Sequence, residues 1–220
     1  MPRDPFLLFA SLLVLVFSVV LHEVAHARVA RAFGDRTAEE QGRLTLNPLR
    51  HVDPVMSLLV PLAVLWASNG AYAFGAARPV PVNPARLRTP GAAILVAAAG
   101  PATNVAIGLA SGLLYAGFLR AGVFDFGDKG SIVLGRATAT NFFLAAFNLV
   151  PVPPLDGARV VGGLFPRSLG RLFEAIEPYA FLVLLALIAG RVLDPVFSAT
   201  AAPATEGWLR FLERTIVRGG

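Results

Sequence analysis

The chain has 220 residues, of which 55% are hydrophobic and only 15% charged, and its mean hydropathy is positive. A soluble domain of this length carries about a quarter of its residues as charges, so the composition excludes that class and indicates a membrane protein. The absence of cysteine excludes disulfides, thiol nucleophiles and cysteine-bound metals. The net charge of +5 is spread between apolar segments, which is typical of membrane topology and argues against a nucleic-acid partner.

Four apolar runs are long enough, or nearly so, to cross about 30 Å of hydrocarbon as helices. They cover residues 6–21, 92–119, 132–150 and 181–197, and a shorter run covers residues 55–67. The first run lacks a basic leader and a small-residue cleavage site, so we expect a retained helix and not a removed signal. The runs predict a polytopic α-helical membrane bundle of four spanning helices with one further segment.

Two stretches between these runs have the pattern of short strands. Residues 43–47 alternate, which predicts one strand of a small surface β-hairpin, and residues 74–83 are expected to supply an edge strand because their prolines limit pairing. Residues 206–217 place apolar side chains on one helical face and arginines on the other, so we expect a C-terminal interfacial helix. The domain prediction is a single domain over residues 1–197, with its core at 6–178, and an amphipathic tail over 198–220.

The first apolar run leads into His22, Glu23 and His26, the pattern H-E-x-x-H. Histidines four apart lie on one face of a helix and can bind one ion, with Glu23 beside them to deprotonate a water. Ionisable groups at membrane depth are costly and are a functional hypothesis by default. The pattern therefore predicts a catalytic site for one Zn²⁺ ion.

Catalytic zinc usually has three protein ligands, so a third ligand must come from elsewhere in the chain. His51 is the only other histidine, and its simplest interpretation is a turn residue bonded to backbone, with an accessory role at the metal as the alternative. Asp53 before Pro54 is most simply a helix N-cap, and Glu177 is a further carboxylate. Asp156 follows three prolines that break a helix at membrane depth, a conformation tolerated mainly where it lines a cavity, and this favours Asp156.

Small residues followed by Pro101 and Asn104 form another motif in the run 92–119. It fits either plain helix packing joined by an asparagine, or an Asn104 that hydrogen-bonds a substrate carbonyl. At 1.5 Å per residue, His22 lies about 16 Å before the end of its helix near Phe33, and Asn104 lies about 20 Å after the start of its helix near Gly91. The two residues are therefore at similar depths, and the two side chains are able to meet.

Three motifs in this order on successive apolar segments resemble the site-2 protease family of intramembrane zinc metalloproteases, in its short branch without PDZ or CBS domains. They are His22-Glu23-x-x-His26, Gly100-Pro101-x-x-Asn104, and Asn148-x-x-Pro151 leading to Leu155-Asp156-Gly157. The segments 42–54 and 79–84 add to the likeness, which spans about residues 6–178. The resemblance implies that His22, His26 and Asp156 bind zinc, that Glu23 is the general base, and that Asn104 assists the substrate carbonyl.

If Asp156 joins both histidines, the first helix and the helix at 132–150 must end on the zinc side of the membrane, and the helix at 92–119 must begin there. Both ends of residues 55–67 then lie on that same side, so this segment is expected to be re-entrant or half-spanning. Eleven arginines then share the zinc side and four basic residues the other side, which by the positive-inside rule places the active site toward the cytoplasm at the cell membrane.

The expected activity is hydrolysis of a peptide bond within or near a transmembrane segment of a membrane protein substrate, that is, regulated intramembrane proteolysis in the lipid bilayer. The substrate helix must unwind before attack, and an edge strand containing Val80 and Val82 is expected to bind it by β-augmentation. The alternative is a non-proteolytic zinc-binding membrane transporter or adaptor. A transporter often has inverted repeats, and none is evident in this sequence. An inactive protease that serves as an adaptor would lack Glu23, and Glu23 is present. The sequence does not define the oligomeric state.

Overall fold

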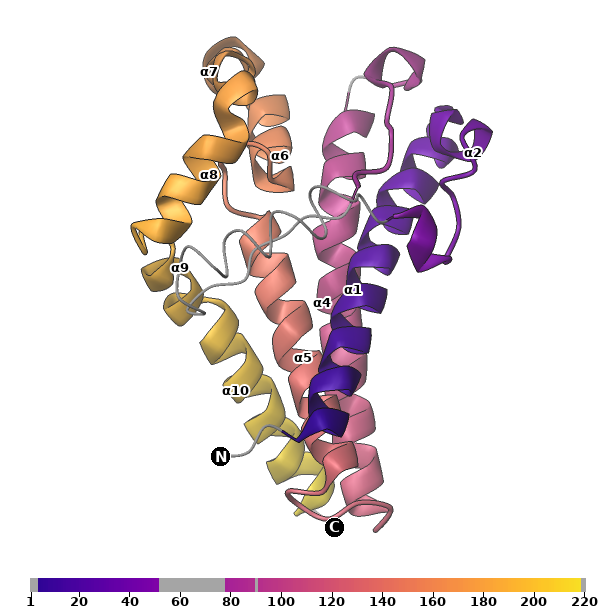
Figure 1. The fold of residues 1–220 in the computed structure, drawn as a ribbon, viewed down its shortest axis with the longest axis vertical. Coiled ribbons are helices and arrows are strands. Elements are labelled where there is room, and N and C mark those ends of the chain that lie inside the picture. Colours follow the sequence, from indigo (N-terminus) through magenta and orange to yellow (C-terminus); the bar gives the residue numbers. More distant parts are fainter. Residues whose placement is uncertain (1–3, 52–77, 90, 219–220) are drawn as a thin grey trace.

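The computed structural model describes residues 4–51, 78–89 and 91–218, and within these residues it is helical with no strand. Three long helices stand side by side along the long axis: α1 (Pro5–Ala32), α4 (Ala92–Arg120) and α5 (Lys129–Asn148) (Figure 1). Because α1 and α4 run in opposite directions and α5 runs with α1, the end of α5 returns to the end of α1 that carries both histidines.

The remaining helices of the described residues are short. The loop after α1 holds α2 (Thr37–Glu40), η1 (Pro48–Arg50) and η3 (Pro84–Arg86). After α5, the chain forms α6 (Asp156–Leu164), η4 (Pro166–Gly170), α7 (Arg171–Ile176), η5 (Glu177–Tyr179) and α8 (Ala180–Ala189). It then descends along the bundle as α9 (Asp194–Ala199), α10 (Ala201–Leu212) and η6 (Glu213–Val217), as Figure 1 shows.

Local signals explain the ends of α1. Asp4 accepts a hydrogen bond from the Phe6 N–H at 2.9 Å, and Pro5 occupies the first helical position, which is a favourable N-terminus. Gly34 follows the C-cap with φ of +105°, a left-handed conformation that glycine adopts without steric cost. The helix therefore starts just before the apolar run and continues well past His26.

Small residues on α4 allow its neighbours to approach closely. A Cβ on Gly108 would lie 2.8 Å from the ring of Phe142 on α5, and one on Gly112 would lie 2.7 Å from Cδ1 of Trp208 on α10 and closer still to its Nε1. Close approach at small residues is the usual way in which membrane helices pack, since lipid offers apolar surface as good as another helix. The expected helix over 206–217 forms, and it packs along α4 and α5 with Leu212 buried; its place at the lipid interface stays a prediction.

Three helical segments of the described chain are long and apolar enough to cross a membrane, where four were expected. They are Pro5–Ala32, Ala92–Arg120 and the joined run Pro166–Ala189. The helix expected at 132–150 forms as α5, but polar residues such as Arg136, Thr138 and Asn141 lower its hydropathy, and two of these face the protein interior. The run expected at 181–197 is interrupted after Ala189, so the apolar helix extends toward the N-terminal side instead.

The predicted β-hairpin is also wrong for the described residues, because 43–47 and 78–83 form no strand. Prolines remove ladder donors, and several of the remaining backbone groups bond to side chains. Arg43 Nη2 donates to the Arg78 carbonyl at 2.7 Å, the Val80 N–H donates to Glu23, and the Asn83 N–H donates to Asp35. The re-entrant segment expected at 55–67, Asp53, and residues 74–77 lie outside the described residues.

Candidate metal centre

The two histidines of α1 and the aspartate that begins α6 meet in the interior. Asp156 Oδ2 lies 3.1 Å from His22 Nε2 and 3.2 Å from His26 Nε2, and the two Nε2 atoms are 3.0 Å apart. All three residues are buried. The structure thus brings the three predicted ligands together, and they are the group of the described residues whose ligand atoms converge as a metal site requires.

The protons of both rings lie on the side away from this group. His26 Nδ1 donates to the Val96 carbonyl of α4 at 2.7 Å, and His22 Nδ1 donates to Asn104 Oδ1 at 2.6 Å. In the neutral rings each Nε2 then carries a lone pair and no proton. Two nitrogen lone pairs and a carboxylate oxygen that lacks a hydrogen-bond partner thus face one another at contact distance.

Three buried acceptors without a proton between them repel one another unless a cation lies among them. Two imidazole nitrogens and one carboxylate oxygen are a ligand set that catalytic zinc uses, with a fourth position left for water or substrate. A hydrogen bond from the other nitrogen of each ring to a protein acceptor is the usual outer support of such ligands. The residues present therefore fit zinc.

Two glycines provide the room for this group. A Cβ on Gly100 of α4 would lie 2.5 Å from both His22 Cε1 and His22 Nε2, so only glycine admits the rings. A Cβ on Gly157 would lie 2.5 Å from the backbone carbonyl oxygen of Val150, so only glycine lets the chain turn directly after Asp156. Val150 and Leu155 pack on Leu184 of α8, and this apolar cluster holds the turn that presents the carboxylate.

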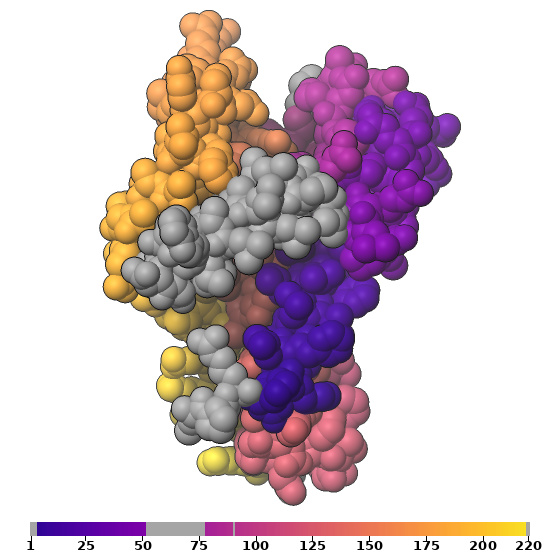
Figure 2. All heavy atoms as spheres, viewed as in Figure 1, coloured from indigo at the N-terminus to yellow at the C-terminus, as the bar shows by residue number. Residues whose placement is uncertain are grey.

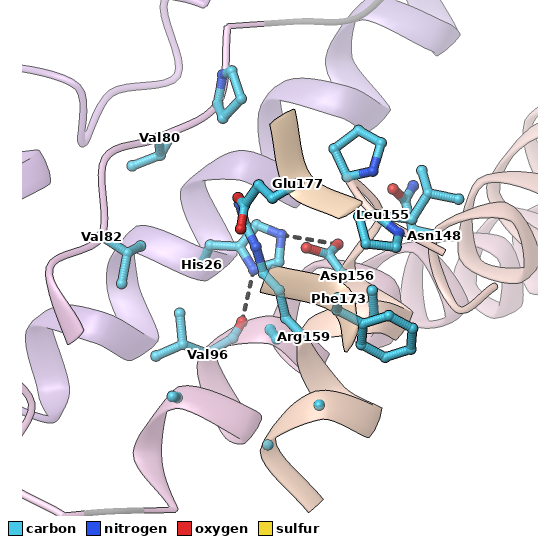
Figure 3. A pocket seen from close by; sticks show the side chains of 18 of the residues that line it. His26, Val80, Val82, Val96, Asn148, Leu155, Asp156, Arg159, Phe173 and Glu177 are labelled. Carbon is cyan, nitrogen blue, oxygen red and sulfur yellow. Dashed lines mark hydrogen bonds and ion pairs between the residues drawn. The ribbon is translucent and has the colours of Figure 1, made fainter. Parts of the chain in front are cut away.

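A cavity of about 770 Å³ opens beside the three ligands. One wall is formed by Pro79–Pro84 with Val80 and Val82, and the opposite wall by Arg159, Phe173 and Glu177 from α6, α7 and η5 (Figure 3). In Figure 2 the hollow at the upper end of the molecule lies between these two walls, the orange segment and the magenta one. A polypeptide segment entering between the walls would reach the ligand group.

Glu23 lines the same cavity, and its Oε2 accepts a hydrogen bond from the Val80 N–H at 2.8 Å. Val80 is buried against Ala27 and Ala38, so the carboxylate is tied to a fixed backbone position. Glu177 also lines the cavity but is not part of the ligand group.

Asn104 and His51 are both bonded to other groups of the protein, and neither is among the three converging ligands. Asn104 touches the cavity, yet it is wholly buried, its oxygen accepts from His22 and its nitrogen donates to Asn141 at 3.0 Å. Its second N–H faces the Ser18 carbonyl at 3.5 Å, so a bond to a substrate carbonyl would have to replace that contact. His51 lies in the loop after η1, where Nε2 donates to the Thr45 carbonyl at 2.9 Å, and it is not part of the ligand group.

Sequence reasoning did not find Asn141 or the Val96 carbonyl. Asn141 is an amide in an apolar run, which is a signal visible in the sequence, and the structure shows that it is wholly buried. The carbonyl of Val96 has no sequence signal, because every residue has one.

Comparison with known proteins agrees with this site. Residues 129–190, which include Asp156, match the model of peptidase family M50. YwhC of Bacillus subtilis, provisionally named a zinc metalloprotease, is 36% identical over 195 residues, covering 84% of each chain. Rip2 of Mycolicibacterium smegmatis, with the same provisional activity in its name, is 31% identical over 83% of this chain and 67% of its own. Rip3 of Mycobacterium tuberculosis, named likewise, is 32% identical over 71% of this chain and 31% of its own.

No solved structure gives a significant match to the chain. The extent of the likeness to YwhC, together with the ligand group and the apolar helices, decides the assignment. The chain belongs to peptidase family M50, the site-2 protease family, and is a membrane zinc metalloprotease.

Proposed function

We propose that this metalloprotease hydrolyses a peptide bond within or near a transmembrane segment of a membrane protein, in regulated intramembrane proteolysis at the cell membrane. One observation carries the proposal: a buried His-His-Asp group adjoins a cavity of about 770 Å³, in a chain with helices apolar enough to cross a bilayer. Water-soluble peptides do not require such a placement.

In this proposal His22, His26 and Asp156 hold one zinc ion. When bound, zinc supplies Lewis-acid chemistry, which acidifies water and polarises a carbonyl oxygen. Glu23 is the general base, since it lines the cavity next to the ligand group and can take a proton and return it to the leaving amine. The Val80 N–H orients this carboxylate by its bond to Oε2.

Asn104 supports His22 from behind in this arrangement. Its hydrogen bond keeps the His22 proton on Nδ1, so that Nε2 stays free to bind a metal. Contact with the substrate carbonyl, the role implied by resemblance, is not needed for this function.

The substrate segment is proposed to lie along Val80 and Val82. Among the described residues the Val82 N–H has no hydrogen-bond partner, although Val82 lines the cavity. An unwound transmembrane segment has free backbone groups, and pairing with this N–H would satisfy one of them. The site selects extended chain over intact helix in this way.

The zinc side is proposed to face the cytoplasm. The chain has no cysteine, so single cysteines can be labelled without background. Glu40→Cys, on the zinc side, should react with a membrane-impermeant maleimide only in broken cells, whereas Asp125→Cys, in the loop between α4 and α5, should react in intact cells. The reverse pattern would contradict the orientation.

The function is tested with purified full-length protein and a single-pass membrane substrate. Wild type should contain one zinc and cleave, whereas Glu23→Gln should contain one zinc and not cleave. Glu39→Gln is the matched control, because Glu39 pairs with Arg31 on the surface and not with the site. Equal cleavage by wild type and Glu23→Gln would remove the catalytic assignment.

A further inference from the structure

Behind the ligand group, three helices share a chain of buried hydrogen bonds. Asn141 of α5 donates through Nδ2 to the Ala137 carbonyl and to Ser18 Oγ of α1, both at 2.9 Å. Asn104 of α4 donates through Nδ2 to Asn141 Oδ1 at 3.0 Å and, at the longer distance of 3.5 Å, to the Ser18 carbonyl, and it accepts at Oδ1 from His22. Asn104 and Asn141 are both wholly buried.

The Ala137 carbonyl fixes which group donates and which accepts along this series of hydrogen bonds. A backbone carbonyl can only accept, so the group of Asn141 facing Ala137 must be its NH₂, and its oxygen must face Asn104. Asn104 must then present NH₂ to Asn141 and oxygen to His22. His22 in turn must carry its proton on Nδ1, and Nε2 is left without one.

We propose that Asn141 is a positioning residue for the metal centre, which selects the metal-binding tautomer of His22 by fixing the orientation of the Asn104 amide. The inference rests on the proposed zinc ligation by His22. Without Asn141, among the described residues only the long contact of 3.5 Å from Asn104 Nδ2 to the Ser18 carbonyl opposes a turn of the amide. Asn104 can then present its NH₂ to His22 Nδ1, the ring carries its proton on Nε2, and that nitrogen cannot bind zinc. His26 needs no such device, since its partner is a carbonyl that cannot be reversed.

The arrangement also explains why an amide lies in α5 at all. Buried polar groups in a membrane helix are costly unless they are satisfied, and every member of this chain is satisfied by the next. Thr138, the neighbouring polar residue on α5, is equally buried, but within the described part of the chain it bonds only to the Leu134 carbonyl of its own helix. Thr138 is therefore a matched control for the loss of a buried polar group.

The test measures the zinc dissociation constant of full-length protein in detergent by competition with a chromogenic chelator. Asn141→Leu should weaken zinc about 10- to 100-fold, the usual effect of losing an outer support of a ligand, and Thr138→Val should leave it unchanged. Wild-type zinc affinity in Asn141→Leu would overturn the proposal.

A second variant, Asn104→Asp, distinguishes an effect of Asn141 on the orientation of the residue at 104 from an effect on helix packing. In Asn104→Asp both side-chain oxygens accept, so His22 Nδ1 finds an acceptor whichever way the group turns. Adding Asn141→Leu to Asn104→Asp should cost no further zinc affinity. An equal loss in both backgrounds would mean that Asn141 acts by packing alone, which would overturn the proposal.

A third measurement needs no variant. The ¹⁵N chemical shifts of His22 in metal-free wild type report which ring nitrogen carries the proton, and Nδ1 is expected. Protonation at Nε2 would overturn the proposal while leaving zinc binding to be judged separately. Failure of wild type to bind zinc would remove the proposed function itself, so the two failures are distinguishable.

Discussion

The substitution Gly100→Ala tests the ligand group most directly, because it adds one methyl group at the point where α4 meets the two rings. The added Cβ would lie 2.5 Å from His22 Cε1 and Nε2 and closer still to His26 Nε2, whereas ordinary contact begins at 3.4 Å. The His22 ring would have to retreat by about 0.9 Å, several times the roughly 0.2 Å by which ligand distances vary in working sites. We expect zinc affinity to fall by about 100-fold or more, at or beyond the upper end for outer-support residues.

The assay is zinc bound per chain after dialysis against a weak chelator, followed by cleavage of the single-pass substrate. The control is Gly117→Ala on the same helix, where an added Cβ meets nothing within 4 Å. Alanine is the better helix former by about 1 kcal/mol, so this control should fold at least as well as wild type and keep its zinc. Full zinc occupancy in Gly100→Ala would refute the inference that both rings converge against α4.

Three further predictions follow from the turn, the loop and the cavity wall. Gly157→Ala should lose zinc as Gly100→Ala does, because the clash is with backbone that cannot move aside; unchanged zinc content would contradict it. Asp35 accepts hydrogen bonds from Thr37 and from the Asn83 N–H. Burial raises the pKa of Asp35, but these bonds outweigh it and hold the pKa below its ordinary value. The anchoring of the loop is therefore complete above about pH 4 and lost as pH falls through the lowered pKa. The protection factor of the Asn83 amide, that is, its exchange rate relative to the intrinsic rate at the same pH, should fall in that acid range and be low at all pH values in Asp35→Asn; a protection factor that does not change with pH in wild type would contradict the assignment. Val82→Pro should reduce cleavage with zinc retained, whereas Val82→Ala should cleave normally, as measured by substrate turnover; equal turnover would exclude backbone pairing there.

The sequence predicted what depends on neighbours along the chain. The spacing of His22 and His26 places them on one face of any helix, and the depth arithmetic for Asn104 is confirmed by its 2.6 Å bond to His22. The prolines before Asp156 marked a broken backbone, and the structure has a turn there that presents the carboxylate. These features are local, so they could be derived without knowing how the helices pack.

The errors arose where local pattern and tertiary partners compete. The alternation at residues 43–47 and the valines at 80 and 82 fit a strand, but the side chains of Arg43, Glu23 and Asp35 took the backbone groups that a ladder would have used. The apolar run that became α5 was long enough for a span, but its polar residues serve the interior of the bundle.

What the sequence by itself determined is the chemistry: the residue types that can hold zinc, their spacing on one helix, and the apolar setting in which they lie. The tertiary structure alone decided which acceptor each ring faces, how Asn141 comes to stand behind Asn104, and why Gly100 must be glycine. The physical reason is that hydrogen-bond direction and steric contact depend on atoms from helices far apart in the chain, and no pattern within one segment contains the position of another.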